Sequence, residues 1–137
     1  MLDVMIRISV LWIFFAVAYS VHYALSFFEP GALQKILSGE NTTATKLVHM
    51  MLIGETCIGW LIPLTMAFLS LTLGDFANRN LNMVLGGLYA LLSILHVAKC
   101  PIIHISNKPS VHQLLIVGST IVVTALIFWY ASSWQIS

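Results

Sequence analysis

Apolar residues form four long runs along the chain, separated by short polar segments. The runs cover residues 4–28, 46–73, 81–100 and 111–134. Each is at least as long as the ~20 residues that an α-helix needs to cross ~30 Å of hydrocarbon. Strands are excluded for these runs, because an open sheet leaves backbone groups without hydrogen-bond partners in lipid. The pattern predicts an all-α integral membrane protein with four spanning helices.

The connections between the runs predict how the helices are arranged. After the first run, "EPG" at residues 29–31 stops the helix, and "ALQKILSGENTTAT" predicts a short interfacial helix followed by a polar loop. "DFANRN" is expected to be a tight second connection, and prolines limit the third. Such short loops make sequential helices antiparallel neighbours. The expected fold is therefore one domain, residues 1–137, with an up-down-up-down four-helix bundle and an interfacial helix in loop 1.

The composition agrees with this class, because 59% of the residues are hydrophobic and only 8% are charged. The first run is too long for a signal peptide and no small-residue cleavage site ends it, so we expect it to be a spanning helix. No basic cluster is large enough for nucleic acid, and the lipid bilayer is the expected partner.

Positive charges are distributed unevenly between the two sides of the predicted membrane protein. The first and third connections have four lysines: Lys35, Lys46, Lys99 and Lys108. The opposite side has Arg7 and Arg79. The positive-inside rule then predicts a multi-pass protein of the cell membrane with both chain ends outside.

One histidine lies near the same membrane face on each predicted helix: His22, His49, His96 and His112. They are three to six residues from the nearer helix end, so at ~1.5 Å per residue they lie within roughly 5 to 9 Å of that face. Histidine rings tolerate the headgroup region, which is the simplest explanation. Alternatively, at least two rings turn into the bundle and bind a transition metal, a haem iron or a quinone headgroup, or relay a proton.

Three residues near the third connection form a separate metal-ligand candidate. His96 and Cys100 are four residues apart and share a helical face, and His104 follows in the loop after Pro101. No cofactor can be named from this pattern. Cys57 and Cys100 lack the paired spacing of a disulfide framework or a redox motif.

Glu55 lies about nine residues inside the second run, where an acid is costly in hydrocarbon unless it faces a partner or water. It is either a hydrogen-bonded structural carboxyl or part of an ion or proton pathway. The ligand or proton site candidates are thus His22, His49, Glu55, His96 and His112.

Small and aromatic residues predict how the helices pack. Five glycines are expected to allow close helix approach: Gly54, Gly59, Gly86, Gly87 and Gly118. Pro63 predicts a bend in the second helix, with its freed carbonyl satisfied by a neighbour. Four aromatic residues predict a belt at one interface: Trp12, Trp129, Tyr130 and Trp134.

Several segments together resemble an uncharacterised family of small, mainly bacterial four-span membrane proteins. They are "LDVMIRISVLWIFF" at 2–15, "FFEPG" at 27–31, "IPLTMAFLSL" at 62–71, "NRNLNMVLGGLYALL" at 78–92 and "ALIFWYASSW" at 125–134. The resemblance covers nearly the whole chain and implies a four-helix fold, but it implies no activity. The chain departs from the family pattern at Tyr23 and Leu61, near which other members have an acid.

Three functions are compatible with these observations. The first is a non-enzymatic membrane protein that associates with itself, as a homo-oligomer, or with a larger membrane complex. The second is an oligomeric transporter of a small molecule or ion with Glu55 on the pathway. The third is a redox protein that binds a metal, haem or quinone through the histidine layer, by which we mean His22, His49, His96 and His112. Hydrolytic catalysis ranks below all three, because no nucleophile and base stand at a recognisable spacing.

Overall fold

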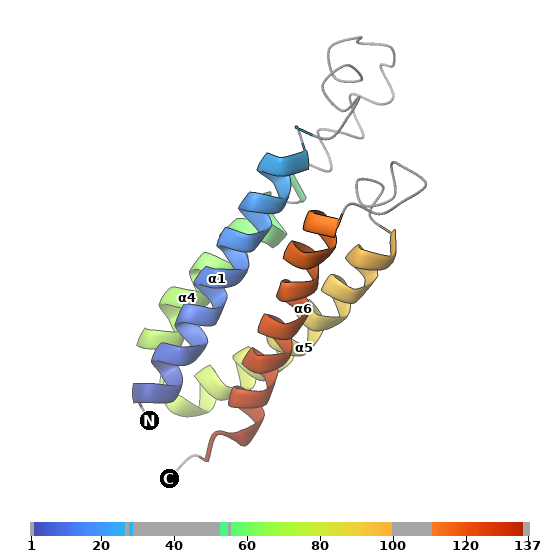
Figure 1. Ribbon diagram of the computed structural model, residues 1–137. Coiled ribbons are helices and arrows are strands. Elements are labelled where there is room, and N and C mark those ends of the chain that lie inside the picture. Colours follow the sequence, from blue (N-terminus) through green and yellow to red (C-terminus); the bar gives the residue numbers. More distant parts are fainter. Residues whose placement is uncertain (1, 27, 29–52, 55, 100–110, 136–137) are drawn as a thin grey trace.

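A computed structural model describes residues 2–26, 28, 53–54, 56–99 and 111–135 of the chain. In this part the chain is helical and contains no strand, as the sequence predicts. Helix α1 covers Leu2–Ser26, the π-helix η1 covers Thr56–Leu61 and leads into α4 at Ile62–Thr72, α5 covers Asp75–Lys99, and α6 covers Val111–Ser133. The helices lie side by side, with both chain ends at the same end of the molecule (Figure 1).

Three of these helices are long and apolar enough to cross a membrane. The qualifying stretches are Leu2–Leu25, Asp75–Ala98 and Leu114–Ser133. The η1–α4 segment, Thr56–Thr72, is apolar but shorter. The predicted second run begins at residue 46, and residues 46–52 lie outside the described part, as does the predicted interfacial helix of loop 1.

Helix α5 begins six residues earlier than the hydrophobic pattern predicts. The segment "DFANRN", expected to be a loop, forms the first turns of α5. Asp75 lies in the first turn, where a carboxylate is favourable because the helix N-terminus carries partial positive charge. The Asn78 backbone N–H donates a 2.9 Å hydrogen bond to the Gly74 carbonyl. Only two residues separate the end of α4 from the start of α5. Asn78 is therefore inside the helix.

Helix α1 lies between α4 and α6, and α5 packs along α6. Helices α4 and α5 are joined directly but contact each other far less than either contacts its other neighbour. Large side chains fill the space between them. Trp12 and Phe15 of α1 each place a ring 5.2 Å from the ring of Tyr89 on α5, in edge-to-face geometry. Such pairs add about 0.5 to 1.5 kcal/mol beyond the burial of their area.

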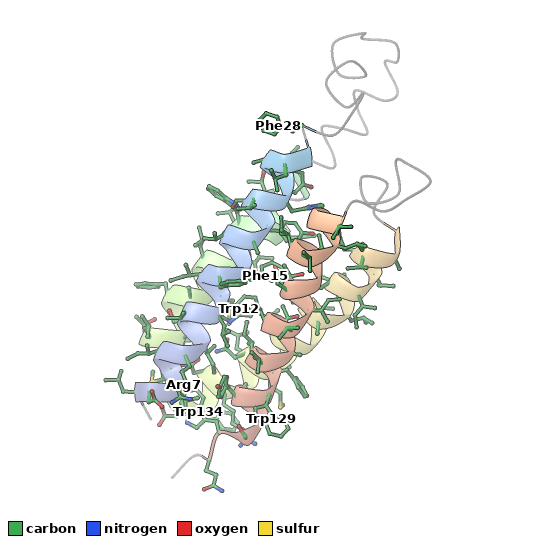
Figure 2. All side chains as sticks on the ribbon, in the orientation of Figure 1. Arg7, Trp12, Phe15, Phe28, Trp129 and Trp134 are labelled. Atoms are coloured by element: carbon green, nitrogen blue, oxygen red, sulfur yellow. The ribbon has the colours of Figure 1, made fainter. Side chains whose placement is uncertain are left out.

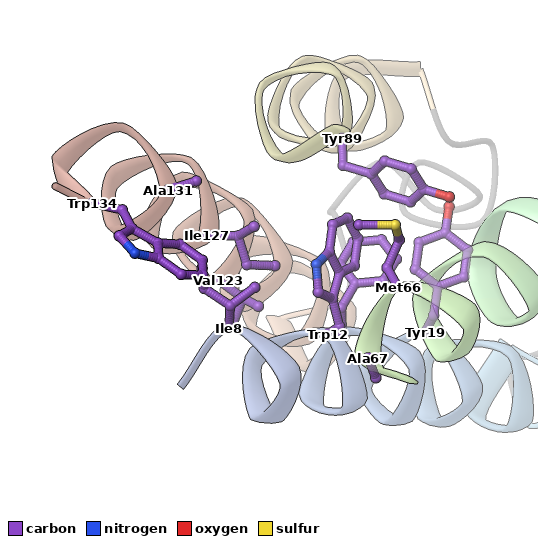
Figure 3. Close-up of a cluster of buried hydrophobic side chains, with 11 residues drawn as sticks. Ile8, Trp12, Tyr19, Met66, Ala67, Tyr89, Val123, Ile127, Ala131 and Trp134 are labelled. Atoms are coloured by element: carbon purple, nitrogen blue, oxygen red, sulfur yellow. The ribbon is translucent and has the colours of Figure 1, made fainter. Parts of the chain in front are cut away.

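The hydrophobic core follows one face of α1. Ile8, Trp12, Phe15 and Tyr19 recur at three- and four-residue spacing and are all buried. They pack against side chains of α4, α5 and α6, including Met66 and Ile127 (Figure 3).

The predicted aromatic belt is only partly present. Trp12 is completely buried in the core, and Trp134 is only 4% exposed. Trp129 is 66% exposed, and it lies at the end of the molecule where Arg7 and the chain ends lie (Figure 2). The belt prediction is therefore wrong for Trp12, whereas Trp134 lies at the same end of the molecule as Trp129 but is buried (Figure 2). Both side chains bury a large apolar ring between helices. The residue type alone does not distinguish a tryptophan buried in this way from one at the membrane interface.

The structure separates glycines that contact a neighbouring helix from those that do not. A Cβ on Gly86 would lie 2.9 Å from the Phe128 backbone nitrogen, so α5 and α6 approach closely there. A Cβ on Gly59 would lie 2.5 Å from Tyr19 Cδ1. A Cβ on Gly87 would make an ordinary van der Waals contact with the Phe128 ring. At Gly118 no described atom of a neighbour lies within 4 Å, so the packing prediction is not met there. At Gly54, which is flanked by residues outside the described part, it stays a prediction.

The π-helix η1 ends two residues before Pro63, the residue at which the sequence predicts a bend. Proline has no N–H, so a carbonyl one turn earlier loses its donor. In the π-helical register that carbonyl belongs to Ile58. The Tyr89 hydroxyl of α5 donates a 2.8 Å hydrogen bond to Ile58 O. A neighbouring helix thus satisfies the carbonyl, as predicted.

Candidate functional site

The inner faces of α1 and α5 bring two of the predicted histidines together. His22 follows the core residue Tyr19 by three positions on α1, so it continues the same buried face and is only 1% exposed. His96 follows the buried Tyr89 by seven positions on α5, which is two helical turns. His96 is half-buried. Both residues lie near the C-terminal ends of their helices, at the end of the molecule opposite the chain ends (Figure 1).

The two rings are in direct contact through their Nε2 atoms. His96 Nε2 lies 3.2 Å from His22 Nε2, and the rings are nearly perpendicular, with centroids 5.2 Å apart. The Tyr19 hydroxyl lies 3.4 Å from His96 Nδ1. The three groups form a chain in which His96 is central. Its tautomer decides the hydrogen-bond directions, since a neutral ring donates from one nitrogen and accepts at the other.

Aromatic rings and one glycine hold this chain in place. The Tyr19 ring stacks on Phe15 with a centroid distance of 5.3 Å, and the Tyr23 ring meets His22 edge-on at 5.8 Å. On its other side the Tyr19 ring lies against Gly59 of η1. A side chain at position 59 would displace the ring, so η1 contributes to the position of the Tyr19 hydroxyl.

The remaining predicted site residues are placed as follows. His49, Glu55, Cys100 and His104 lie outside the described residues, as does the side chain of His112. Among the described residues, no group of three or more histidine, cysteine or acidic side chains could hold a metal ion. The expectation that at least two histidine rings turn inward is met by His22 and His96. Sequence reasoning missed Tyr19, although its three-residue spacing from His22 was a usable signal.

A second buried polar cluster lies between α1, α4 and α5. The Trp12 indole donates a 2.7 Å hydrogen bond to Asn82 Oδ1, and Asn82 Nδ2 donates to Asn78 Oδ1 at 2.6 Å. Asn78 Nδ2 in turn donates to the Ser70 carbonyl at 2.7 Å. These four residues are all buried. Along α5 the cluster is fourteen residues from His96, or roughly 20 Å at ~1.5 Å per residue.

This Trp12–Asn82 cluster satisfies its own hydrogen bonds and presents no group to a ligand. Its side chains connect three helices, because Ser70 is on α4, the two asparagines are on α5 and Trp12 is on α1. Buried networks of this kind specify one packing arrangement when all members are satisfied. We therefore assign the Trp12–Asn82 cluster to the architecture and the histidine pair to the candidate site.

Comparison of the chain with family models, with curated proteins and with solved structures gives no match. The resemblance to a family of four-span bacterial membrane proteins stays a prediction.

Proposed function

We propose that the chain is a multi-pass protein of the cell membrane in which η1–α4 is the core of a fourth crossing. The three long apolar helices support this, together with the position of both chain ends at one end of the molecule. The predicted fold follows, with an up-down-up-down four-helix bundle, an interfacial helix in the first loop and both ends outside. Membership in a family of bacterial four-span membrane proteins is consistent with this proposed fold.

Within this architecture, we propose that the protein binds a ligand through His22 and His96. The observation that carries the proposal is the 3.2 Å separation of their Nε2 atoms next to the hydrophobic core. Rings that merely tolerate a headgroup region would point their nitrogens toward lipid or water. Here His22 is buried, and its ring nitrogen faces a second imidazole. Pairs of imidazole nitrogens are common ligands in proteins.

Ligand binding thus becomes the first hypothesis. The sequence alone favoured self-association or membership in a larger complex. Association through apolar faces stays a prediction, because the exposed apolar side chains would serve lipid equally well. Transport with Glu55 on the pathway also stays a prediction, since Glu55 lies outside the described residues.

The test is to identify what the protein holds when it is purified from membranes in mild detergent. We expect metal analysis, a visible spectrum or organic extraction to reveal a bound species in the wild type. His96→Ala should lose that species because it removes one of the two Nε2 atoms. Ser133→Ala, an exposed change at the other end of the molecule, is the control. A wild-type protein that neither contains nor takes up any ligand would contradict the proposal.

A further inference from the structure

We infer that His22 and His96 are two ligands of a divalent first-row transition-metal ion, and that Tyr19 is the positioning residue for His96. The inference rests on the proposed function and narrows its ligand. Imidazole suits zinc, copper, iron and nickel, and zinc is the appropriate probe because it has no redox chemistry.

The separation of the two nitrogens matches the spacing of neighbouring ligands on one ion. Two imidazole nitrogens that bind zinc at ~2.0–2.1 Å in tetrahedral geometry are about 3.3 Å apart. His22 Nε2 and His96 Nε2 are 3.2 Å apart. Helices α1 and α5 therefore already stand at the correct separation. The ion needs only small rotations of the two rings.

The same separation disfavours the other ligands considered for the histidine layer. A haem iron takes its two axial nitrogens on opposite faces of a flat macrocycle, and nitrogens in hydrogen-bond contact leave no room for it. A quinone carbonyl accepts a hydrogen bond from an N–H, but here the two Nε2 atoms face each other. A small cation that binds both lone pairs at once fits this geometry.

Proton positions in the pair are consistent with metal binding. A neutral pair in hydrogen-bond contact holds one hydrogen between its two Nε2 atoms. Binding of the ion requires both Nε2 lone pairs, so this hydrogen moves to Nδ1 of the same ring. Each imidazole stays neutral, the ion keeps its two positive charges, and no oxidant or reductant takes part.

Tyr19 stabilises the metal-binding tautomer of His96. Its oxygen lies 3.4 Å from His96 Nδ1 and can accept a hydrogen bond from an Nδ1–H group. That tautomer leaves the lone pair of His96 Nε2 available for the ion. Metal-binding histidines commonly donate their second N–H to an oxygen in this way, which fixes the tautomer and the orientation of the ring.

The position of the pair gives an ion a short path from the aqueous phase. His22 is four residues from the end of α1 and His96 is three from the end of α5. At ~1.5 Å per residue, both lie about 5 to 6 Å from the helix ends. The described residues supply two ligands, and water molecules complete the coordination.

The experiment titrates zinc into metal-free, detergent-purified protein by calorimetry, with Co²⁺ absorption as a second readout. We expect wild-type protein to bind one Zn²⁺ per chain, and His22→Gln and His96→Gln to abolish this binding. Tyr19→Phe should weaken it about 10- to 100-fold, as loss of a group that orients a ligand does. Tyr130→Phe is the matched control, because it removes a tyrosine hydroxyl near Arg7, at the other end of the molecule, and should leave zinc affinity unchanged.

Circular dichroism and gel filtration show whether each variant folds. His96→Cys keeps the test decisive if a glutamine variant does not fold, since a thiolate at this position should retain zinc. It should also add a sulfur charge-transfer band to the Co²⁺ spectrum. Absence of that band in a folded His96→Cys protein would overturn the inference.

The outcomes also separate this inference from the proposed function. Unchanged zinc binding in both glutamine variants would overturn the metal site. If the wild type binds no zinc but extraction yields an organic ligand that His96→Ala loses, the metal site is wrong and the proposed function stands. If neither ligand is found, both are wrong.

Discussion

Gly59 fixes the position of the Tyr19 ring, so its replacement should affect both stability and the candidate site. In Gly59→Ala the new methyl group would lie 2.5 Å from Tyr19 Cδ1, and the ring or helix must move. We expect a loss of about 1 to 3 kcal/mol in the free energy of unfolding, the usual range for overpacking.

Gly118→Ala provides the matched control, because no described neighbouring atom lies within 4 Å of the added methyl group. Alanine also has the higher helix propensity, by up to about 1 kcal/mol, so this variant should be as stable as the wild type or more stable. Thermal and denaturant unfolding in detergent would measure both. Equal stability of the two variants would show that Tyr19 does not pack against Gly59 as described.

At the residue scale, the sequence predicted depth along the helices better than contacts between them. His22 and His96 were correctly expected near the same end of their helices, because helix ends and a rise per residue are sufficient for that inference. Contact between His22 and His96 was only one of several possible pairings. The pairing of Trp12 with Asn82 was missed altogether, although both residues are buried. Their 2.7 Å hydrogen bond joins residues 70 positions apart, and no local pattern specifies such a pairing.

At the element scale, the presence of each described helix could be predicted from the sequence, but the face that the helix buries could not. Both lipid and the protein interior are apolar, so a helix in this setting has no strong contrast between its two sides. Helix α1 illustrates this, since Val10 and Val17 are exposed while Ile8 and Phe15 are buried. The start of α5 was also missed, because its first turns contain polar residues that a hydropathy argument assigns to a loop.

The contact of Tyr89 with η1 gives a prediction about this element. Tyr89→Phe removes the donor to Ile58 O, which should cost about 0.6 kcal/mol and at most about 1.7 kcal/mol, the average and the maximum for hydrogen bonds between helices in a membrane protein. In a Pro63→Ala background, the restored N–H can satisfy a carbonyl of the preceding turn. Tyr89→Phe should then cost less than half as much.

A double-mutant cycle on unfolding free energies measures this coupling. Ser70→Ala, which removes a hydroxyl that bonds to Met66 O within α4, should cost the same in both backgrounds. If Tyr89→Phe were equally costly with and without Pro63, the tyrosine would not be compensating for the proline.

At the scale of the whole molecule, an aromatic layer separates two levels of polar side chains. Trp12, Phe15 and Tyr89 meet ring to ring between the Trp12–Asn82 cluster and the histidine pair. One level joins the helices near the chain ends, and the other presents ring nitrogens near the opposite end. A protein organised this way can keep a rigid packing arrangement at one face and a ligand site at the other.

The number of membrane crossings is the property of the whole molecule that most affects the proposed function. Four crossings place both chain ends on one side, whereas three would place them on opposite sides. The lysine excess in the first and third connections predicts that both ends are outside. The η1–α4 segment decides between these outcomes, because Thr56–Thr72 alone is shorter than the three other apolar helices.

Labelling of single cysteines with a membrane-impermeant thiol reagent tests this topology. With Cys57 and Cys100 replaced by serine, Leu2→Cys and Gln135→Cys should both react in intact cells, since both positions are exposed. Ser106→Cys, in the third connection, should react only after permeabilisation. If only one chain end reacts in intact cells, the η1–α4 segment does not complete a crossing. Reaction of both ends only after permeabilisation would keep four crossings but reverse the orientation, which places the histidine pair at the outer face, where an ion from outside the cell would reach it first.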